Sequence, residues 1–194
     1  TWNHENELAA PQRNPGGVLV PQTKKGLTGK GFEFLAEMER MHMIVDVSHL
    51  SDKGFWDIVE HGTRPFAASH SNCRALAPHT RNLTDEMIRA LSERGGIAGL
   101  NYYAPFLDTD PTHPENCRST VELIAKHAAH YKQVGGAQMI ALGSDFDGID
   151  GPHQLENAAF LPLLADALRK EGFTEDEVEG IYYRNAMRFF EENL

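Results

Sequence analysis

The sequence predicts an α/β fold with a parallel sheet at its centre. Short apolar runs rich in strand-forming residues alternate with longer segments of helical period, and this order recurs four times along the chain. Polar residues close three of these runs: His49 and His70 end the first two, and Asp145 ends the last. Strands that alternate with helices align in parallel, so we expect these three side chains at one edge of one sheet.

The predicted elements follow one another in a regular order. Residues 1–26 are rich in Asn, Pro, Gly and Gln and have no period, which is typical of a long surface loop. Strands are predicted over 43–47, 66–69, 96–102 and 139–145. Helices are predicted over 28–42, 51–61, 84–95, 119–134 and 155–171, a last helix begins at the capping box 174–177, and a polar loop covers 104–117.

Local signals justify two of these helices in particular. In the helix over 28–42, Thr28 is the predicted N-cap and the apolar residues recur at three-residue steps, namely Phe32, Leu35, Met38 and Met41. We expect methionines at such spacing to face the core. The helix over 84–95 combines an N-cap at Thr84, an acidic first turn and a closing Gly95.

Composition limits the class of protein. The 194 residues are 41% hydrophobic, enough for one domain with a sizeable core. A formal net charge of −10 argues against nucleic acid or an anionic membrane as a partner, because phosphates would be repelled, and favours small molecules. Cys73 and Cys117 form no CxxC motif, no run is apolar enough to span a membrane, and no export signal is visible; we therefore expect a cytoplasmic protein.

The polar residues at the strand ends have the composition of a metal site. Two histidines and one or two aspartates, Asp145 and Asp147, would meet at one sheet edge. Neutral imidazole and carboxylate suit zinc and its first-row neighbours, and such a cluster can activate water. The simpler interpretation of each histidine alone is a hydrogen-bonded loop residue, but three such strand ends in one chain favour the metal.

Competing motifs are weak. The sequence has neither a GxGxxG nor a GKS/T loop, so no nucleotide cofactor is indicated. His127 and His130 are one helical turn apart, but the glutamate of an HExxH helix is absent, so we interpret them as surface or helix-packing residues.

Several motifs together carry a resemblance that none of them carries alone. In order and nearly end to end, the chain resembles the renal-type membrane dipeptidase family at Trp2–His4, Gly26–Gly31, Asp46–His49, Ser69–Ser71, Arg81–Asn82, Asn101–Tyr103 and Gly143–Gly148. The resemblance implies a (β/α)8 TIM barrel of the metallo-dependent hydrolase type. Residues 1–194 would form the C-terminal part of that single domain, with about the last four strands, and residues 1–26 would be a long active-site loop.

The resemblance also implies roles for individual residues. His49 and His70 match two imidazole ligands of one zinc in a centre of two zinc ions. Asp145 matches the acid/base carboxylate, and Arg81 matches the side chain that binds the C-terminal carboxylate of a dipeptide substrate. His4 matches a histidine that polarises the scissile carbonyl and so contacts substrate during catalysis. Hydroxide held between two metals would attack the peptide bond, and a planar guanidinium suits recognition of a free carboxylate.

The chain also departs from the family pattern. The resemblance calls for a His-x-Asp pair and a bridging Glu upstream of the residue that matches His4, and neither is present. We therefore expect the missing N-terminal half of the barrel as a partner and an inactive isolated chain; a homodimer remains open. Asp147 is interpreted as a residue that orients the site. The alternatives are a non-catalytic binding relative and a mononuclear hydrolase of lactones, amides or phosphoesters.

Overall fold

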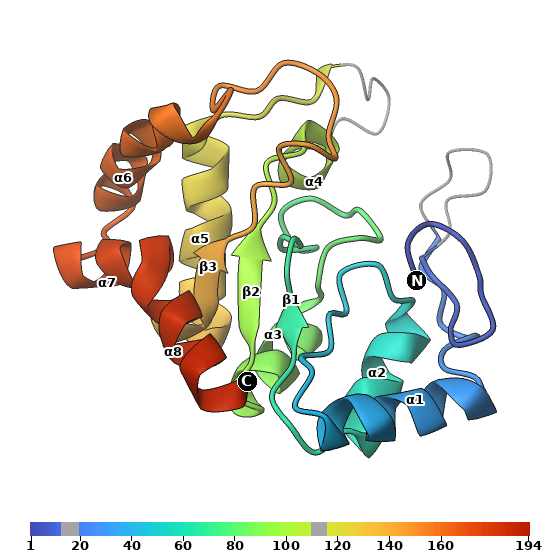
Figure 1. The fold of residues 1–194 in the computed structure, drawn as a ribbon. Coiled ribbons are helices and arrows are strands. Elements are labelled where there is room, and N and C mark those ends of the chain that lie inside the picture. The colour runs from blue at the N-terminus through green and yellow to red at the C-terminus, as the bar shows by residue number, and fades with distance from the viewer. Residues whose placement is uncertain (13–19, 110–115) are drawn as a thin grey trace.

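The computed structural model describes residues 1–12, 20–109 and 116–194 and places a parallel sheet at the centre of the molecule (Figure 1). The sheet order is β1–β2–β3, with β1 over Ala67–Ala68, β2 over Ile97–Leu100 and β3 over Ile140–Leu142. Ala67 pairs with Ile97, and Ala98 with Ile140. A helix connects each strand to the next, as parallel pairing requires.

Helices surround this sheet. The α-helices are α1 (Gly29–Arg40), α2 (Asp52–His61), α3 (Asp85–Glu93), α4 (Ala104–Leu107), α5 (Val121–Gly135), α6 (Leu161–Lys170), α7 (Glu175–Glu179) and α8 (Asn185–Asn193). Short 3-10 turns are η3 (Ala137–Met139) and η4 (Ala158–Phe160), and a π-helical turn, η5 (Gly180–Arg184), joins α7 to α8.

The two faces of the sheet bury different sets of side chains. Side chains alternate between faces along a strand. Ala68, Ala98 and Ile140 belong to the large core that includes residues of α3 and α5. Ala67 and Ile97 lie on the other face, in a small cluster that Phe189 of α8 covers. The C-terminal ends of the three strands lead into loops at the top of the view, on the side of α4 (Figure 1).

Most predicted helices are confirmed, because their start signals act locally. The side chains of the predicted N-caps Thr28, Thr84 and Thr174 accept hydrogen bonds from backbone N–H groups of the first helical turn, and Thr174 forms the predicted capping box with Glu177. Gly95 follows α3 with φ of +72°, the left-handed conformation that glycine adopts without strain.

The strand predicted over 43–47 is wrong as a regular strand. Around Asp46 the chain makes a single parallel bridge to Ala67, where Val47 N–H donates to the Ala67 carbonyl and Ala67 N–H donates to the Val45 carbonyl. Two hydrogen bonds still align this segment beside β1. Asp46 and His49 are therefore held at the same sheet edge as the residues that follow β1.

Three other predictions need correction. Residues 104–107 of the predicted polar loop form α4, because Phe106 and Leu107 are buried; residues 110–115 of that loop, like residues 13–19, lie outside the described residues. The helix predicted from 155 begins only at Leu161, because Pro162 fits the first turn of a helix but not its interior. Met41 is 56% exposed and does not face the core.

Candidate active site

A cavity of about 640 Å³ lies beside the C-terminal ends of the strands. Segments far apart in sequence build it: the N-terminal segment, the residues after the Val45–Val47 segment, and the loops that follow β1, β2 and β3. Its lining residues are Trp2, Asn3, Gln12, His49, His79, Arg81, Tyr103, Phe106, Asp145, Gly148 and Ile149.

His49 lines this cavity, and His70 meets it there from the neighbouring segment, as predicted. Their Nε2 atoms are 2.9 Å apart. On the outer side of each ring, Nδ1 has a partner: Asn3 Oδ1 lies 3.3 Å from that of His49, and Ser69 Oγ lies 2.7 Å from that of His70. Burial and the nearby Arg81 guanidinium lower the pKa of His49 to about 3 and also lower that of His70. Both rings are therefore uncharged at neutral pH.

The paired imidazoles fit a zinc ion. Zinc bound to histidine has Zn–N distances of about 2.0–2.1 Å and tetrahedral angles, which puts two such nitrogens about 3.3 Å apart. The observed 2.9 Å would have to open by about 0.4 Å. Neutral imidazole is the form that binds metal. The described residues thus supply two nitrogen ligands of the right kind, and further ligands would have to come from elsewhere.

Behind His70, the Asp46 carboxylate is held by several donors. Its Oδ1 accepts from the backbone N–H of Ser48 and Ser69, and its Oδ2 accepts from the Ser69 hydroxyl at 2.5 Å. Burial by itself would raise the pKa of Asp46, but these hydrogen bonds outweigh it and the pKa is lowered. Asp46 is therefore ionised at neutral pH.

Asp145 lines the same cavity in an unusual backbone conformation. Its φ is +66°, uncommon for a residue other than glycine. Asn101 Nδ2 donates to Asp145 Oδ2 at 3.1 Å, and Gly148 N–H donates to the Asp145 carbonyl at 2.9 Å. A Cβ at position 148 would lie 2.3 Å from Asp145 Oδ1, so any other residue there would displace the carboxylate from this position. Strained residues of this kind cluster at functional sites.

Three buried asparagines connect the loops around the cavity, and we call them the asparagine ladder: Asn72, Asn82 and Asn101. Asn101 N–H donates to Asn72 Oδ1, and Asn72 N–H donates to Asn82 Oδ1. The side-chain amides of Asn72 and Asn82 both donate to the Phe106 carbonyl. The ladder thus joins the loop after β1, the loop after β2 and, through Asn101, Asp145.

Arg81 presents a donor without a partner. Its side chain is buried, its guanidinium carbon lies 5.4 Å from the centre of the Phe106 ring, and Nη1 is a buried nitrogen with no hydrogen-bond partner within the described ranges. Burial lowers the pKa of Arg81 to about 10, against the opposing effect of Asp46 and Asp145, so it stays charged at neutral pH. A buried cation with a free donor in a cavity suits an anionic ligand.

His4 and Asp147 stand apart from this group. His4 is exposed and is not among the lining residues; its ring lies 6.1 Å from the Trp2 ring, which in turn lies 6.4 Å from that of His49. Asp147 is exposed and also does not line the cavity. The structure therefore brings His49, Arg81 and Asp145 to the cavity, pairs His70 with His49, and leaves the other two residues at the periphery.

Sequence reasoning missed some residues of the site. His79 lines the cavity, accepts a hydrogen bond from Arg81 N–H at 3.1 Å, and packs its ring 4.4 Å from that of Phe106. Burial, with help from Arg81 and Arg74, lowers the pKa of His79 to about 4. His79 lies in a loop and Phe106 in the short helix α4, and neither follows a predicted strand directly or belongs to a motif, so the sequence offers no signal for them.

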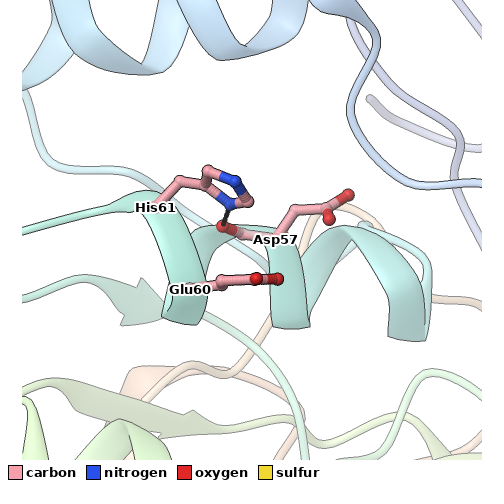
Figure 2. Close-up of side chains that lie close together, drawn as sticks. All are labelled: Asp57, Glu60 and His61. Atoms are coloured by element: carbon pink, nitrogen blue, oxygen red, sulfur yellow. Dashed lines mark hydrogen bonds between the residues drawn. The ribbon is translucent and has the colours of Figure 1, made fainter.

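Histidines elsewhere have structural roles. His127 is a buried packing residue, as predicted: its Nδ1 accepts from Cys73 N–H and its Nε2 donates to the Leu107 carbonyl. A second group with metal-type donors, Asp57, Glu60 and His61, lies on α2 (Figure 2). Two of its members already have other partners, because the Asp57 carboxylate accepts from Leu27 N–H and Lys53, and His61 Nδ1 donates to the Asp57 carbonyl (Figure 2).

A parallel sheet that gathers imidazoles, a carboxylate and a buried arginine at the C-terminal ends of its strands suits metal-dependent hydrolysis in an α/β barrel, where active sites lie at that edge. The sequence matches the membrane dipeptidase family, peptidase family M19, over residues 1–193. The chain belongs to this family of metallopeptidases.

Individual relatives agree. An uncharacterized protein from the pqqA 5′ region of Klebsiella pneumoniae is 36% identical over 96% of this chain and 68% of its own length. An uncharacterized dipeptidase of Schizosaccharomyces pombe is 33% identical over 97% of this chain and 44% of its own length.

Solved structures share the fold. A Rhodobacter sphaeroides metallopeptidase, liganded with a phosphinate mimic of the dipeptide L-Ala-D-Ala, superposes with a TM-score of 0.88 at 29% identity, over 100% of this chain and 54% of its own. A dipeptidase of family M19 superposes with a TM-score of 0.86 at 32% identity, over 99% of this chain and 56% of its own. The chain is thus a partial barrel that spans about half the length of these structures.

Within the described residues, no helix has both the length and the apolar character needed to cross a bilayer.

Proposed function

We propose that this chain is part of a zinc-dependent dipeptidase that hydrolyses the peptide bond of dipeptides. The observation that carries the proposal is a cavity lined by a buried arginine donor and by one of two uncharged imidazoles whose Nε2 atoms face each other. The imidazoles of His49 and His70 suit a cation, and Arg81 suits an anion. A substrate that places a carboxylate on Arg81 would lie within the same cavity as the metal.

Each remaining residue then has a defined task. Zinc, when bound, lowers the pKa of water and supplies a nucleophile at neutral pH. Asp145, held by Asn101, would carry a proton to the leaving amine. Arg81 would select substrates with a free C-terminal carboxylate, because a planar guanidinium binds both of its oxygens. His4 would contact the scissile carbonyl after the N-terminal segment moves closer, since it now lies beyond Trp2.

Completion of the site would need the other part of the barrel. We infer that a polypeptide equivalent to the N-terminal half of the relatives supplies the remaining metal ligands, within one chain or as a separate one. An apolar stripe on the last helices supports this proposal: Tyr183, Met187 and Phe190 are 52%, 50% and 46% exposed at helical spacing, and Leu194 is 73% exposed. Such a stripe is typical of a surface that another element covers.

Metal content tests the proposal most directly. Elemental analysis of the native purified protein, together with its intact mass, should find two zinc ions in a complex or chain large enough to complete the barrel. The 194-residue chain alone should hold at most one zinc and show no turnover. Metal-dependent dipeptide hydrolysis by the isolated chain would refute the need for a second half. A barrel of full size without bound metal would refute the dipeptidase assignment.

Substrate selection tests the role of Arg81. A complete enzyme should prefer a dipeptide with a free C-terminal carboxylate over the same dipeptide amidated by at least about 100-fold, because a buried charge would otherwise stay unpaired. Arg81→Met should remove most of this preference, while Arg89→Met, at an exposed position, serves as the matched control. Equal hydrolysis of both substrates by the unmodified enzyme would favour a mononuclear hydrolase of simple amides instead.

A further inference from the structure

The side of His70 that faces away from the cavity is held by a short chain of hydrogen bonds. Ser69 Oγ lies 2.7 Å from His70 Nδ1 and 2.5 Å from Asp46 Oδ2. The same hydroxyl therefore touches both the imidazole and the carboxylate. Asp46 comes from the segment that ends in His49, so these contacts link the two chain segments that carry the paired imidazoles.

The chemistry of these groups fixes the position of each proton. An ionised carboxylate can only accept hydrogen bonds, so the Ser69 hydroxyl must donate to Asp46. With its single proton committed, Ser69 Oγ can only accept from His70, so the proton of the neutral ring lies on Nδ1. Nε2 then carries a bare lone pair, and it faces the Nε2 of His49 at 2.9 Å.

The orientation of the Asp46 carboxylate is equally constrained. Oδ1 accepts from two backbone N–H groups, those of Ser48 and Ser69, and only Oδ2 faces the Ser69 hydroxyl. The Ser48 hydroxyl accepts from the backbone N–H of His70 at 2.9 Å and lies 3.4 Å from Ser69 Oγ, but it does not contact the ring. Because the Ser69 proton is committed to Asp46, Ser48 can only donate to Ser69 Oγ and leaves the direction of the Ser69 hydroxyl unchanged. Ser48 thus helps to place His70, whereas Ser69 sets the state of its ring.

We propose that Asp46 and Ser69 are positioning residues that hold His70 as its Nδ1–H tautomer and thereby present Nε2 to a metal ion. The proposal rests on the proposed function for the identity of the ion. Partners of this kind fix the tautomer and direction of metal-binding histidines in general. Here the carboxylate acts through a serine rather than directly, which makes the effect dependent on the direction in which the hydroxyl points.

This dependence predicts an unusual outcome for Asp46→Asn. The amide oxygen should stay on the two backbone N–H groups that Oδ1 now serves, which turns the amide N–H₂ toward Ser69. Ser69 Oγ would then accept from Asn and donate its own proton to His70 Nδ1. The ring proton would move to Nε2, so the substitution should invert the tautomer rather than merely loosen the ring.

Long-range ¹H–¹⁵N spectra of the purified protein, labelled at histidine and stripped of metal by a chelator, read the tautomer directly. The wild-type protein should show His70 with its proton on Nδ1. Asp46→Asn should show it on Nε2, and Ser69→Ala should give a mixture of both. Ser69→Thr, which keeps the hydroxyl, should restore the wild-type state, and Ser48→Ala should retain it. A backbone amide spectrum confirms that each variant is folded.

Zinc titration with a competing chelator provides the second readout. Asp46→Asn and Ser69→Ala should bind zinc about 10- to 100-fold more weakly than wild type, while Ser69→Thr should stay within a few-fold. An unchanged His70 tautomer in both folded Asp46→Asn and Ser69→Ala proteins would overturn the proposal. If the wild-type protein shows the Nδ1–H tautomer and the variants shift it, but no form binds zinc, the positioning role of Asp46 and Ser69 is confirmed and the proposed function fails.

Discussion

The surroundings of His127 and His70 differ in what they leave unsatisfied. Both rings are uncharged at neutral pH, since burial lowers the pKa of each. His127 has a backbone partner at each nitrogen, Cys73 N–H at one and the Leu107 carbonyl at the other. His70 has Ser69 Oγ at Nδ1, while the partner of its Nε2 is the Nε2 of another imidazole, that of His49. In the core both ring nitrogens are held by backbone groups, whereas at the sheet edge two ring nitrogens that could both bind a cation face each other.

This difference separates structural from functional histidines better than burial or sequence position does. A nitrogen held by a buried backbone group offers nothing to a metal, even when the ring is neutral and well placed. Two imidazole nitrogens that face each other can share one proton as a hydrogen bond, and a metal ion that replaces this proton can bind both. If this difference matters, folding stability should depend on His127, whose nitrogens bind backbone groups, and metal binding should depend on the facing imidazoles of His49 and His70.

The largest effect on stability is expected from His127→Ala. The substitution leaves Cys73 N–H and the Leu107 carbonyl buried without partners and should lower the free energy of unfolding by about 3–4 kcal/mol. Urea denaturation measures the change. Zinc affinity of the folded variant should stay at the wild-type value, and a large loss of zinc binding would contradict the separation of the two regions.

The converse effect is expected from His70→Ala. Loss of one of two paired nitrogens should weaken zinc binding at least about 100-fold, equivalent to about 2.7 kcal/mol. Without metal, the unfolding free energy should change by less than about 1 kcal/mol, because both rings are only partly buried and water can replace the lost hydrogen bond between them. Competition titration and urea denaturation measure the two quantities. Unweakened zinc binding would place the metal elsewhere.

Lowered pH should destabilise the fold through His127. Burial lowers the pKa of its ring to about 4, while an unfolded histidine has a pKa of about 6.5. The unfolded state therefore takes up a proton first, and stability should fall by up to about 1.4 kcal/mol per pH unit from pH 6.5 down to about pH 4, where the effect levels off. Denaturation midpoints measured across this range should fall less steeply in His127→Ala. An equal slope in both proteins would assign the effect to other groups.

The smallest effect is expected from His130→Ala. Its ring lies 2.7 Å from an Asp85 carboxylate oxygen near the surface, where ion pairs contribute little. The unfolding free energy should fall by less than about 1 kcal/mol, and zinc affinity should not change. Thermal denaturation alongside His127→Ala provides the comparison, and a loss as large as that of His127→Ala would show that position on α5, not hydrogen bonding, determines the cost.

Features with local causes could be predicted from the sequence. Thr28, Thr84 and Thr174 cap their helices because each signal lies within one turn of its helix. The same holds for the paired histidines, since His49 and His70 directly follow apolar runs and parallel topology brings such ends together.

Features that depend on residues far apart in the sequence could not be predicted. The segment around Asp46 has the composition of a strand, yet in the described residues it makes only one bridge, to Ala67. His79 reaches the cavity because the loop after β1 is held by Asn72 and Asn82, whose partners lie far away in sequence. Hydrogen bonds of this kind depend on the completed fold, and no period or residue spacing in the sequence predicts them.

The asparagine ladder implies that these loops open together. Asn72, Asn82 and Asn101 form hydrogen bonds with one another or with the Phe106 carbonyl. One loop therefore cannot detach without leaving buried amide groups in the other loops without their hydrogen-bond partners. Amide protons of the linked loops should therefore exchange with solvent at one common opening free energy, as a single cooperative unit. Asp145, which accepts a hydrogen bond from Asn101, would leave its position only when the whole unit unfolds.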